Sequence, residues 1–134
     1  MNRRTFLGTT LILPLLGKMV SAAEVPAPRP NEGLILFYRP RRAAGSAIRF
    51  FVTSNGVQLG NLANGTAMAH RVKPGQHSFQ VSTPSVDGND NVTVNVKSGQ
   101  TVFIRGDIRM GWPAGRGKFT VMSETQGRSE VSAM

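Results

Sequence analysis

Short apolar runs, each ended by turn-forming residues, follow one another from residue 33 onward. Val92, Val94 and Val96 alternate with polar residues, which is the period-two pattern of a strand with one buried face. We therefore expect Val94 to face a core. Residues 34–39 form an almost continuous apolar run of the β type. No stretch of the sequence has the apolar period of an amphipathic helix.

Turn-forming pairs of residues divide this region into strands. Asn55-Gly56 predicts a two-residue hairpin, because both central positions of that turn need positive φ. Asn64-Gly65 and Pro74-Gly75 mark further reversals. The predicted strands cover residues 34–39, 47–53, 57–62, 66–72, 76–83, 92–97, 101–109 and 119–122, with polar loops at 84–91 and 111–117. Such a pattern predicts an all-β fold, a small antiparallel β-sandwich of seven to nine short strands.

The first 22 residues have the pattern of a secretory signal peptide. Arg3-Arg4 precede a short apolar stretch, and Val20-Ser21-Ala22 supplies small residues for cleavage. The apolar stretch is too short to span a bilayer, which needs about 20 residues. Asn2 to Leu7 resembles the twin-arginine export motif, with a general secretory signal and an uncleaved N-terminal anchor as the alternatives. We therefore expect a periplasmic or secreted protein, exported through a cleaved signal peptide.

Three further segments follow the signal peptide. Val25 to Pro30 holds three prolines, which keep a chain extended and semi-rigid, so residues 23–32 are predicted to be a Pro-rich linker. The β-sandwich domain is expected over residues 33–125. Residues 126–134 are expected to be a C-terminal tail without a clear structural preference.

Charge and cysteine content narrow the possible functions. The chain holds 16 Lys and Arg against 7 Asp and Glu, a net charge of +9, of which +6 belongs to residues 23–134. A basic surface favours contact with anionic polymers or lipid headgroups. The chain has no cysteine, which excludes disulfides, thiolate metal sites, cysteine nucleophiles and a lipid-modified cysteine.

Several short motifs resemble, in their order, those of the bacterial domain-of-unknown-function family 2846. They are Leu36-Phe37-Tyr38-Arg39-Pro40, Gly45-Ser46, Val57 with Gly60, Leu62 with Asn64-Gly65, Pro74-Gly75-Gln76-His77, Gly99-Gln100-Thr101 and Gly115-Arg116. The resemblance covers residues 33–125 and implies a small Ig-like or transthyretin-like sandwich. It also implies an exported or lipid-anchored protein. The family has no established catalytic residues that could be assigned to positions of this chain. This chain has no cysteine to which a lipid anchor could be attached.

Arginines concentrate around a reversal at Pro40. Because Pro40 ends the first predicted strand and Gly45 permits a turn, we expect Arg41 and Arg42 to lie on an exposed loop. Arginine beside aromatic rings suits phosphate, carboxylate or sugar-phosphate ligands, whereas scattered solvated charges are the alternative. The candidate ligand-binding residues are Arg39, Arg41, Arg42, Arg49, Trp112 and Arg116, with Tyr38, Arg109 and Lys118 beside them.

The two histidines are a second candidate centre. If Pro74-Gly75 closed a two-residue hairpin, His70 would face Phe79, and His70 and His77 would share one face of a sheet. No third ligand is evident in the sequence nearby, so partly buried histidines are the simpler interpretation and no metal or cofactor is predicted.

Other motifs do not meet the requirements of known chemistry. Asp87 to Asn91 lacks the Gly and Glu positions of a calcium loop, and Gly111 to Lys118 lacks the first Gly and the Ser or Thr of a phosphate loop. No Gly-x-Ser-x-Gly motif occurs, and no two acids form a close pair in apolar surroundings. We therefore do not expect an enzyme.

These observations lead to one hypothesis with two alternatives. The chain is expected to be a non-catalytic exported envelope domain that binds a protein partner or an anionic envelope polymer or lipid, rather than nucleic acid. One alternative is a metal-handling or enzymatic protein that uses His70 and His77. The other is a structural accessory domain without a ligand.

Overall fold

A computed structural model describes residues 18–20, 25–84, 86–109 and 115–134, apart from the side chains of residues 18, 20 and 86–89. The elements are β1 (Lys18–Val20), β2 (Gly33–Tyr38), β3 (Phe50–Ser54), β4 (Val57–Leu62), β5 (Ala67–Val72), β6 (Gly75–Thr83), β7 (Val86–Val96), β8 (Thr101–Arg109), β9 (Arg116–Met122) and α1 (Glu124–Ser132). In the described ranges no helix is long and apolar enough to cross a membrane.

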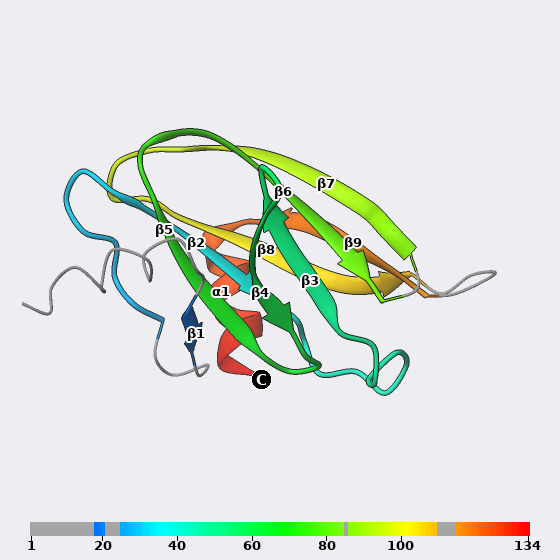
Figure 1. Ribbon diagram of the computed structural model, residues 1–134. Helices are drawn as coiled ribbons and strands as arrows, with labels where there is room; N and C mark the ends of the chain where they lie inside the picture. Colours follow the sequence, from blue (N-terminus) through cyan, green and yellow to red (C-terminus); the bar gives the residue numbers. More distant parts are fainter. Residues whose placement is uncertain (1–17, 21–24, 85, 110–114) are drawn as a thin grey trace, which may run out of the picture.

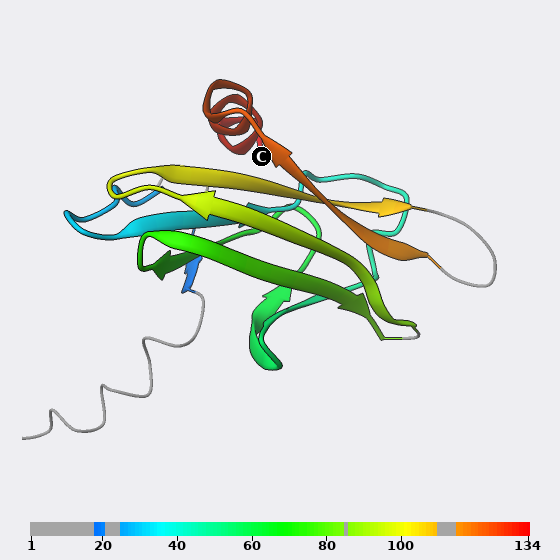
Figure 2. The same ribbon diagram turned by 90° about the horizontal axis from the view of Figure 1, so that it is seen from above.

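The strands form two sheets that pack face to face (Figure 1). Among the described residues, one sheet has the order β1-β5-β2-β8-β9 and the other the order β4-β3-β6-β7. Figure 2 shows the two sheets as layers, with α1 on the outer side of the five-stranded sheet. The predicted all-β sandwich is thus confirmed. One pairing differs from the antiparallel prediction: β2 and β8 run parallel, which the long connection through both sheets permits.

The core lies between the sheets and extends around the central strand β2. Every residue of β2 is buried, which explains its almost continuous apolar sequence. Ile35 and Phe37 face the second sheet, where they join the main apolar cluster. Leu34, Leu36 and Tyr38 face the other way and form a second cluster that includes Val131 of α1. The five-stranded sheet is therefore covered on both sides along β2.

The helix α1 is an element that the sequence analysis did not predict. Only Gly127 and Val131 of this helix are buried, so it lacks the apolar stripe that identifies most helices. Its start does carry a signal: Ser123 and Gln126 have the spacing of a capping box. The Ser123 side chain accepts a hydrogen bond from the backbone N–H of Gln126 at 3.2 Å. Residues 126–134, predicted to be a tail, thus lie mostly in a helix.

Some of the predicted turns and strands agree with the structure, and others do not. The predicted hairpin at Asn55-Gly56 is confirmed, with φ of 51° and 78°. Val94 is 8% exposed and joins the core, as expected. The predicted loop at residues 84–91 is wrong, because β7 begins at Val86 and pairs with β6 up to its end at Thr83. A strand rich in Asp, Asn and Gly resembles a loop in sequence. Of the predicted loop at 111–117, residues 111–114 lie outside the described ranges, and β9 begins at Arg116.

Candidate functional site

Several exposed cations gather where β2 and β8 end. Because β2 and β8 are parallel, with Tyr38 opposite Arg105, their carboxyl ends lie at the same end of the sheet. The segment that follows β2 runs past the end of β8 (Figure 2). We call this surface the basic end and define it by its exposed cations, which are Arg41, Arg42, Arg109, Arg116 and Lys118.

The pairing of β8 with β9 places two like charges together. Arg109 lies directly opposite Arg116, and both side chains are exposed. Like charges directly opposite each other on adjacent strands destabilise a sheet. Lys118 lies opposite Asp107 on the same face. The register therefore places two arginines opposite each other at a site where their charges do not help stability.

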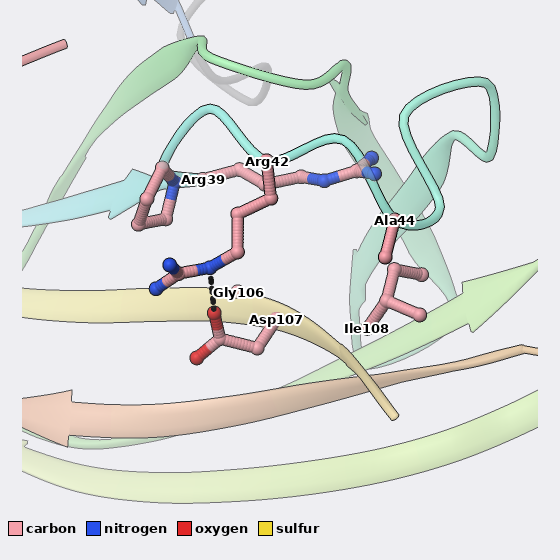
Figure 3. Close-up of a pocket in the computed structure, with 7 residues that line it drawn as sticks. Arg39, Arg42, Ala44, Gly106, Asp107 and Ile108 are labelled. Carbon is pink, nitrogen blue, oxygen red and sulfur yellow. Dashed lines mark ion pairs between the residues drawn. The ribbon is translucent and has the colours of Figure 1, made fainter. Parts of the chain in front are cut away.

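The carboxylates described beside the basic end already have partners. Asp107 pairs with Arg42 at 3.5 Å, between Oδ1 and Nε, and with Arg105 at 2.8 Å, between Oδ2 and Nε. Figure 3 shows Arg42 and Asp107 facing each other. Asp90 on β7 accepts a hydrogen bond from the backbone N–H of Phe119 at 2.9 Å. None of the described ion pairs joins these carboxylates to Arg109 or Arg116. The carboxylates therefore do not neutralise the charges of these two arginines.

The hollow beside Arg42 is small. Its volume is about 70 Å³, and its walls include Arg39, Arg42, Asp107 and Ile108. Pockets for small organic ligands usually measure about 300–1,000 Å³. The basic end is therefore suited to contact over a surface rather than to enclosure of a compact ligand.

Arg39 does not belong to this surface, which corrects the prediction that grouped it with its neighbours. It is 3% exposed, and its guanidinium lies 4.2 Å above the ring centroid of Phe50. The guanidinium donates to the carbonyls of Gly45 at 2.7 Å, Leu62 at 3.1 Å and Ile48. Burial lowers the pKa of Arg39. Figure 3 shows this side chain extending away from Asp107 toward the loop that holds Ala44. Arg39 therefore stabilises the loop after β2 by hydrogen bonds from a buried position.

The other candidates from the sequence lie in different places. Arg41 and Arg42 are exposed on an irregular loop, as expected, and the Arg42 side chain is 57% exposed. The backbone N–H of Arg42 donates to Oδ1 of Asn64 at 2.9 Å, which holds the loop in place. Arg49 is exposed just before β3, and no described contact joins it to the basic end. Trp112 lies outside the described residues.

A partly buried network of hydrogen bonds joins α1 to the five-stranded sheet next to the basic end. The Tyr38 hydroxyl donates to Oε1 of Glu130 at 2.5 Å, and Arg105 donates to Oε2 of Glu130 at 2.9 Å. Burial opposes ionisation of Glu130, but the hydrogen bond from Tyr38 and the charge of Arg105 outweigh it and lower its pKa. Burial first, and then Glu130, raise the pKa of Tyr38. Sequence reasoning missed Arg105, Asp107 and Glu130, because no local pattern brings these residues together.

Both histidines lie next to Phe79, but not on the two strands of one hairpin. The two-residue hairpin considered for Pro74-Gly75 does not form, because β5 and β6 belong to different sheets. His70 and His77 approach the Phe79 ring from the two layers, with ring centroids 6.2 Å and 6.4 Å from it. His77 Nε2 contacts the Lys73 carbonyl at 2.7 Å. Among the described residues no third His, Cys, Asp or Glu completes a metal site with them.

Comparison with known families identifies most of this domain. Residues 29–123 match the family described as "Protein of unknown function (DUF2846)". The search of curated proteins gives no match. The matched range includes β2 to β9 and stops just before α1. The match covers well over half of the chain, and the motifs that resembled the family lie within it, so the chain belongs to the DUF2846 family.

Proposed function

We propose that this protein is a non-catalytic exported envelope domain whose basic end binds an anionic polymer of the envelope. The observation that carries the proposal is the exposed pair of Arg109 and Arg116, directly opposite each other on β8 and β9. A bound anion relieves the repulsion between them, and each guanidinium offers planar, bidentate donors to phosphate or carboxylate groups.

A polymer fits this surface better than a compact ligand does. The cations of the basic end come from the loop after β2, from β8 and from β9, so they spread over three segments. The hollow beside Arg42 measures only about 70 Å³. A chain of repeating anionic groups can contact several of these cations at once without entering a pocket.

A binding assay tests the proposal directly. Affinity of the full chain is measured for polyphosphate and for alginate, and separately for vesicles with and without phosphatidylglycerol, from low to high salt. We expect binding to the soluble polyanions that weakens as salt rises, because the Debye length falls from ~10 Å at 0.1 M to ~3 Å at 1 M. Binding to anionic vesicles alone would assign the surface to lipid headgroups instead.

Matched variants separate a site from general charge. Arg109→Ser with Arg116→Ser should weaken polyanion binding about tenfold and leave the melting temperature equal or higher, because the repulsion is removed. The control, Lys73→Ser with Lys97→Ser, removes the same charge from exposed positions elsewhere. Arg41→Ala with Arg42→Ala should also weaken binding. Equal losses in the control and in the Arg109 and Arg116 variant would show that only net charge matters.

The export part of the proposal has its own test. Arg3→Lys with Arg4→Lys should leave the precursor in the cytoplasm, as measured by cell fractionation. Unchanged export of this variant would mean that the general secretory route is sufficient.

A further inference from the structure

The outer edge of β5 is covered by a short strand from the N-terminal segment. In the described residues, β5 lies between β2 and β1, and β1 is the edge strand. β1 pairs antiparallel with β5 at Ala67, Met68 and Ala69, half of the length of that strand. All three residues of β1 lie within residues 1–22, the predicted signal peptide. Cleavage of that peptide, which is part of the proposed function, leaves β5 as the edge of the sheet.

A β5 edge without β1 has the features of a site for strand pairing. Its backbone N–H and C=O groups on that side lose their partners, which makes any uncovered edge a template for another strand. Ala67, Met68 and Ala69 carry no charge and no proline that would block pairing. The pairing of β5 with β2 runs without a register shift, so the edge is regular.

The register of β1 shows which strand fits there. Met19 lies opposite Met68, with Lys18 opposite Ala69 and Val20 opposite Ala67. A second β5, related by a two-fold axis at Met68, lies antiparallel in the same register. It places Met68 opposite its copy and Ala67 opposite Ala69. Arg71 then falls opposite Gly65 rather than opposite its copy, so the two Arg71 side chains do not face each other across the pair.

We infer that the β5 edge is a self-association site, which β1 covers in the unprocessed chain and which a second copy of the protein occupies when β1 is removed. The two copies form an isologous pair through β5, in which the five-stranded sheets join into one continuous sheet. β1 thus keeps the precursor monomeric until the signal peptide leaves.

Proline substitutions in β1 of the full chain test this inference. Met19→Pro with Val20→Pro removes the N–H groups that a strand needs, whereas Met19→Thr with Val20→Thr keeps a strand-forming sequence as the control. Sedimentation equilibrium is expected to show a mass that rises about twofold with concentration for the proline variant and stays at one chain for the control. Hydrogen exchange in β2 and β8 verifies that the core of the proline variant is folded. If the double variant does not fold, Met19→Pro alone is used as a milder variant.

A cross-link tests the register itself. The chain has no cysteine, so Ala67→Cys with Ala69→Cys in the proline background introduces the sole thiols. The two-fold pairing places the thiol at position 67 opposite the thiol at position 69 of the second copy, close enough for intermolecular disulfides after mild oxidation. A folded proline variant that stays monomeric, or dimers that do not cross-link, would overturn the inference. Neither readout involves an anion, so failure of the polymer-binding proposal leaves this result unaffected.

Discussion

At the scale of single residues, Arg39 is buried although arginine is usually an exposed residue. Its neighbours Arg41 and Arg42 are exposed, yet the Arg39 side chain turns inward after β2 and donates to three carbonyls, two in the loop after β2 and one at the end of β4. These carbonyls belong to residues outside regular pairing or at the end of β4, where a donor is needed. A guanidinium serves this purpose because its five N–H groups lie in one plane.

Replacement of Arg39 is therefore expected to destabilise the fold. Arg39→Ala leaves buried carbonyls without donors and opens a space above Phe50, and should lower the free energy of unfolding by about 3 kcal/mol. Arg39→Lys should restore only part of this, because an ammonium cannot bridge the same three acceptors. Urea denaturation measures the effect. Arg41→Ala, the exposed control, should change stability by less than about 0.5 kcal/mol, and an equal loss there would contradict the structural role of Arg39.

A second single-residue prediction concerns pH. Burial first, and then the charge of His77, lower the pKa of His70, whose buried Nδ1 has no hydrogen-bond partner among the residues that the structure describes. In the unfolded chain His70 takes up a proton near pH 6.5. The unfolded state therefore binds more protons in acid, and stability that is present above about pH 6.5 is lost as the pH falls.

Urea unfolding at pH 7.5 and pH 5.5 checks this prediction. The wild type should lose more free energy of unfolding over this range than His70→Gln, which keeps a polar side chain but cannot titrate. The same loss in both proteins would show that other groups cause the pH dependence.

At the scale of elements, α1 depends on what it covers rather than on its own preference for helix. Gly127 is unfavourable in the middle of a helix. It lies against Phe103, where an added Cβ would overlap Cγ of that ring. Arg128 lies 5.4 Å above the same ring, and Glu130 pairs with Arg105. Close approach to the sheet therefore requires glycine at this position.

A substitution that favours isolated helices should thus weaken this one. Gly127→Ala gains about 1 kcal/mol in helix propensity, but the clash with a buried ring should cost more. We expect a lower melting temperature for Gly127→Ala and a slightly higher one for Ser129→Ala on the exposed side of the same helix. A stabilised Gly127→Ala protein would mean that α1 lies farther from Phe103.

At the scale of the whole molecule, two apolar layers hold the domain together. One layer lies between the sheets, and the other lies between α1 and the outer side of the five-stranded sheet. The family match ends at residue 123, so α1 lies beyond it although Val131 completes the outer cluster. The folded unit of this chain therefore extends past the matched range.

A truncation tests this extension. A chain that ends at Ser123 should expose Leu34, Leu36 and Phe103, bind the dye ANS, associate in gel filtration and melt at a lower temperature. A chain that ends at Ser132, which keeps all of α1, should behave nearly as the full chain does. A stable, monomeric product of the shorter truncation would show that α1 is dispensable.

Local sequence patterns were enough to predict the class of the fold and many of its strands. The predicted bounds of 57–62 and 101–109 match β4 and β8, and the Asn55-Gly56 turn has the backbone that its residues favour. The same holds for Val94, whose alternation with polar neighbours identified its buried face. These features depend on steric preferences and on burial patterns within a few residues, which any segment carries with it.

The pairing of the strands, and hence which charges lie opposite each other, depends on long-range packing. The assignment of β5 and β6 to different sheets, the parallel pairing of β2 with β8 and the inward turn of Arg39 all depend on contacts between distant segments. The Arg109 and Arg116 pair requires the register of β8 with β9. The nearly polar helix α1 likewise needs Phe103 and Arg105 of the sheet to hold it. Local sequence cannot specify these contacts, because their free energy arises only when surfaces far apart in the chain are buried together.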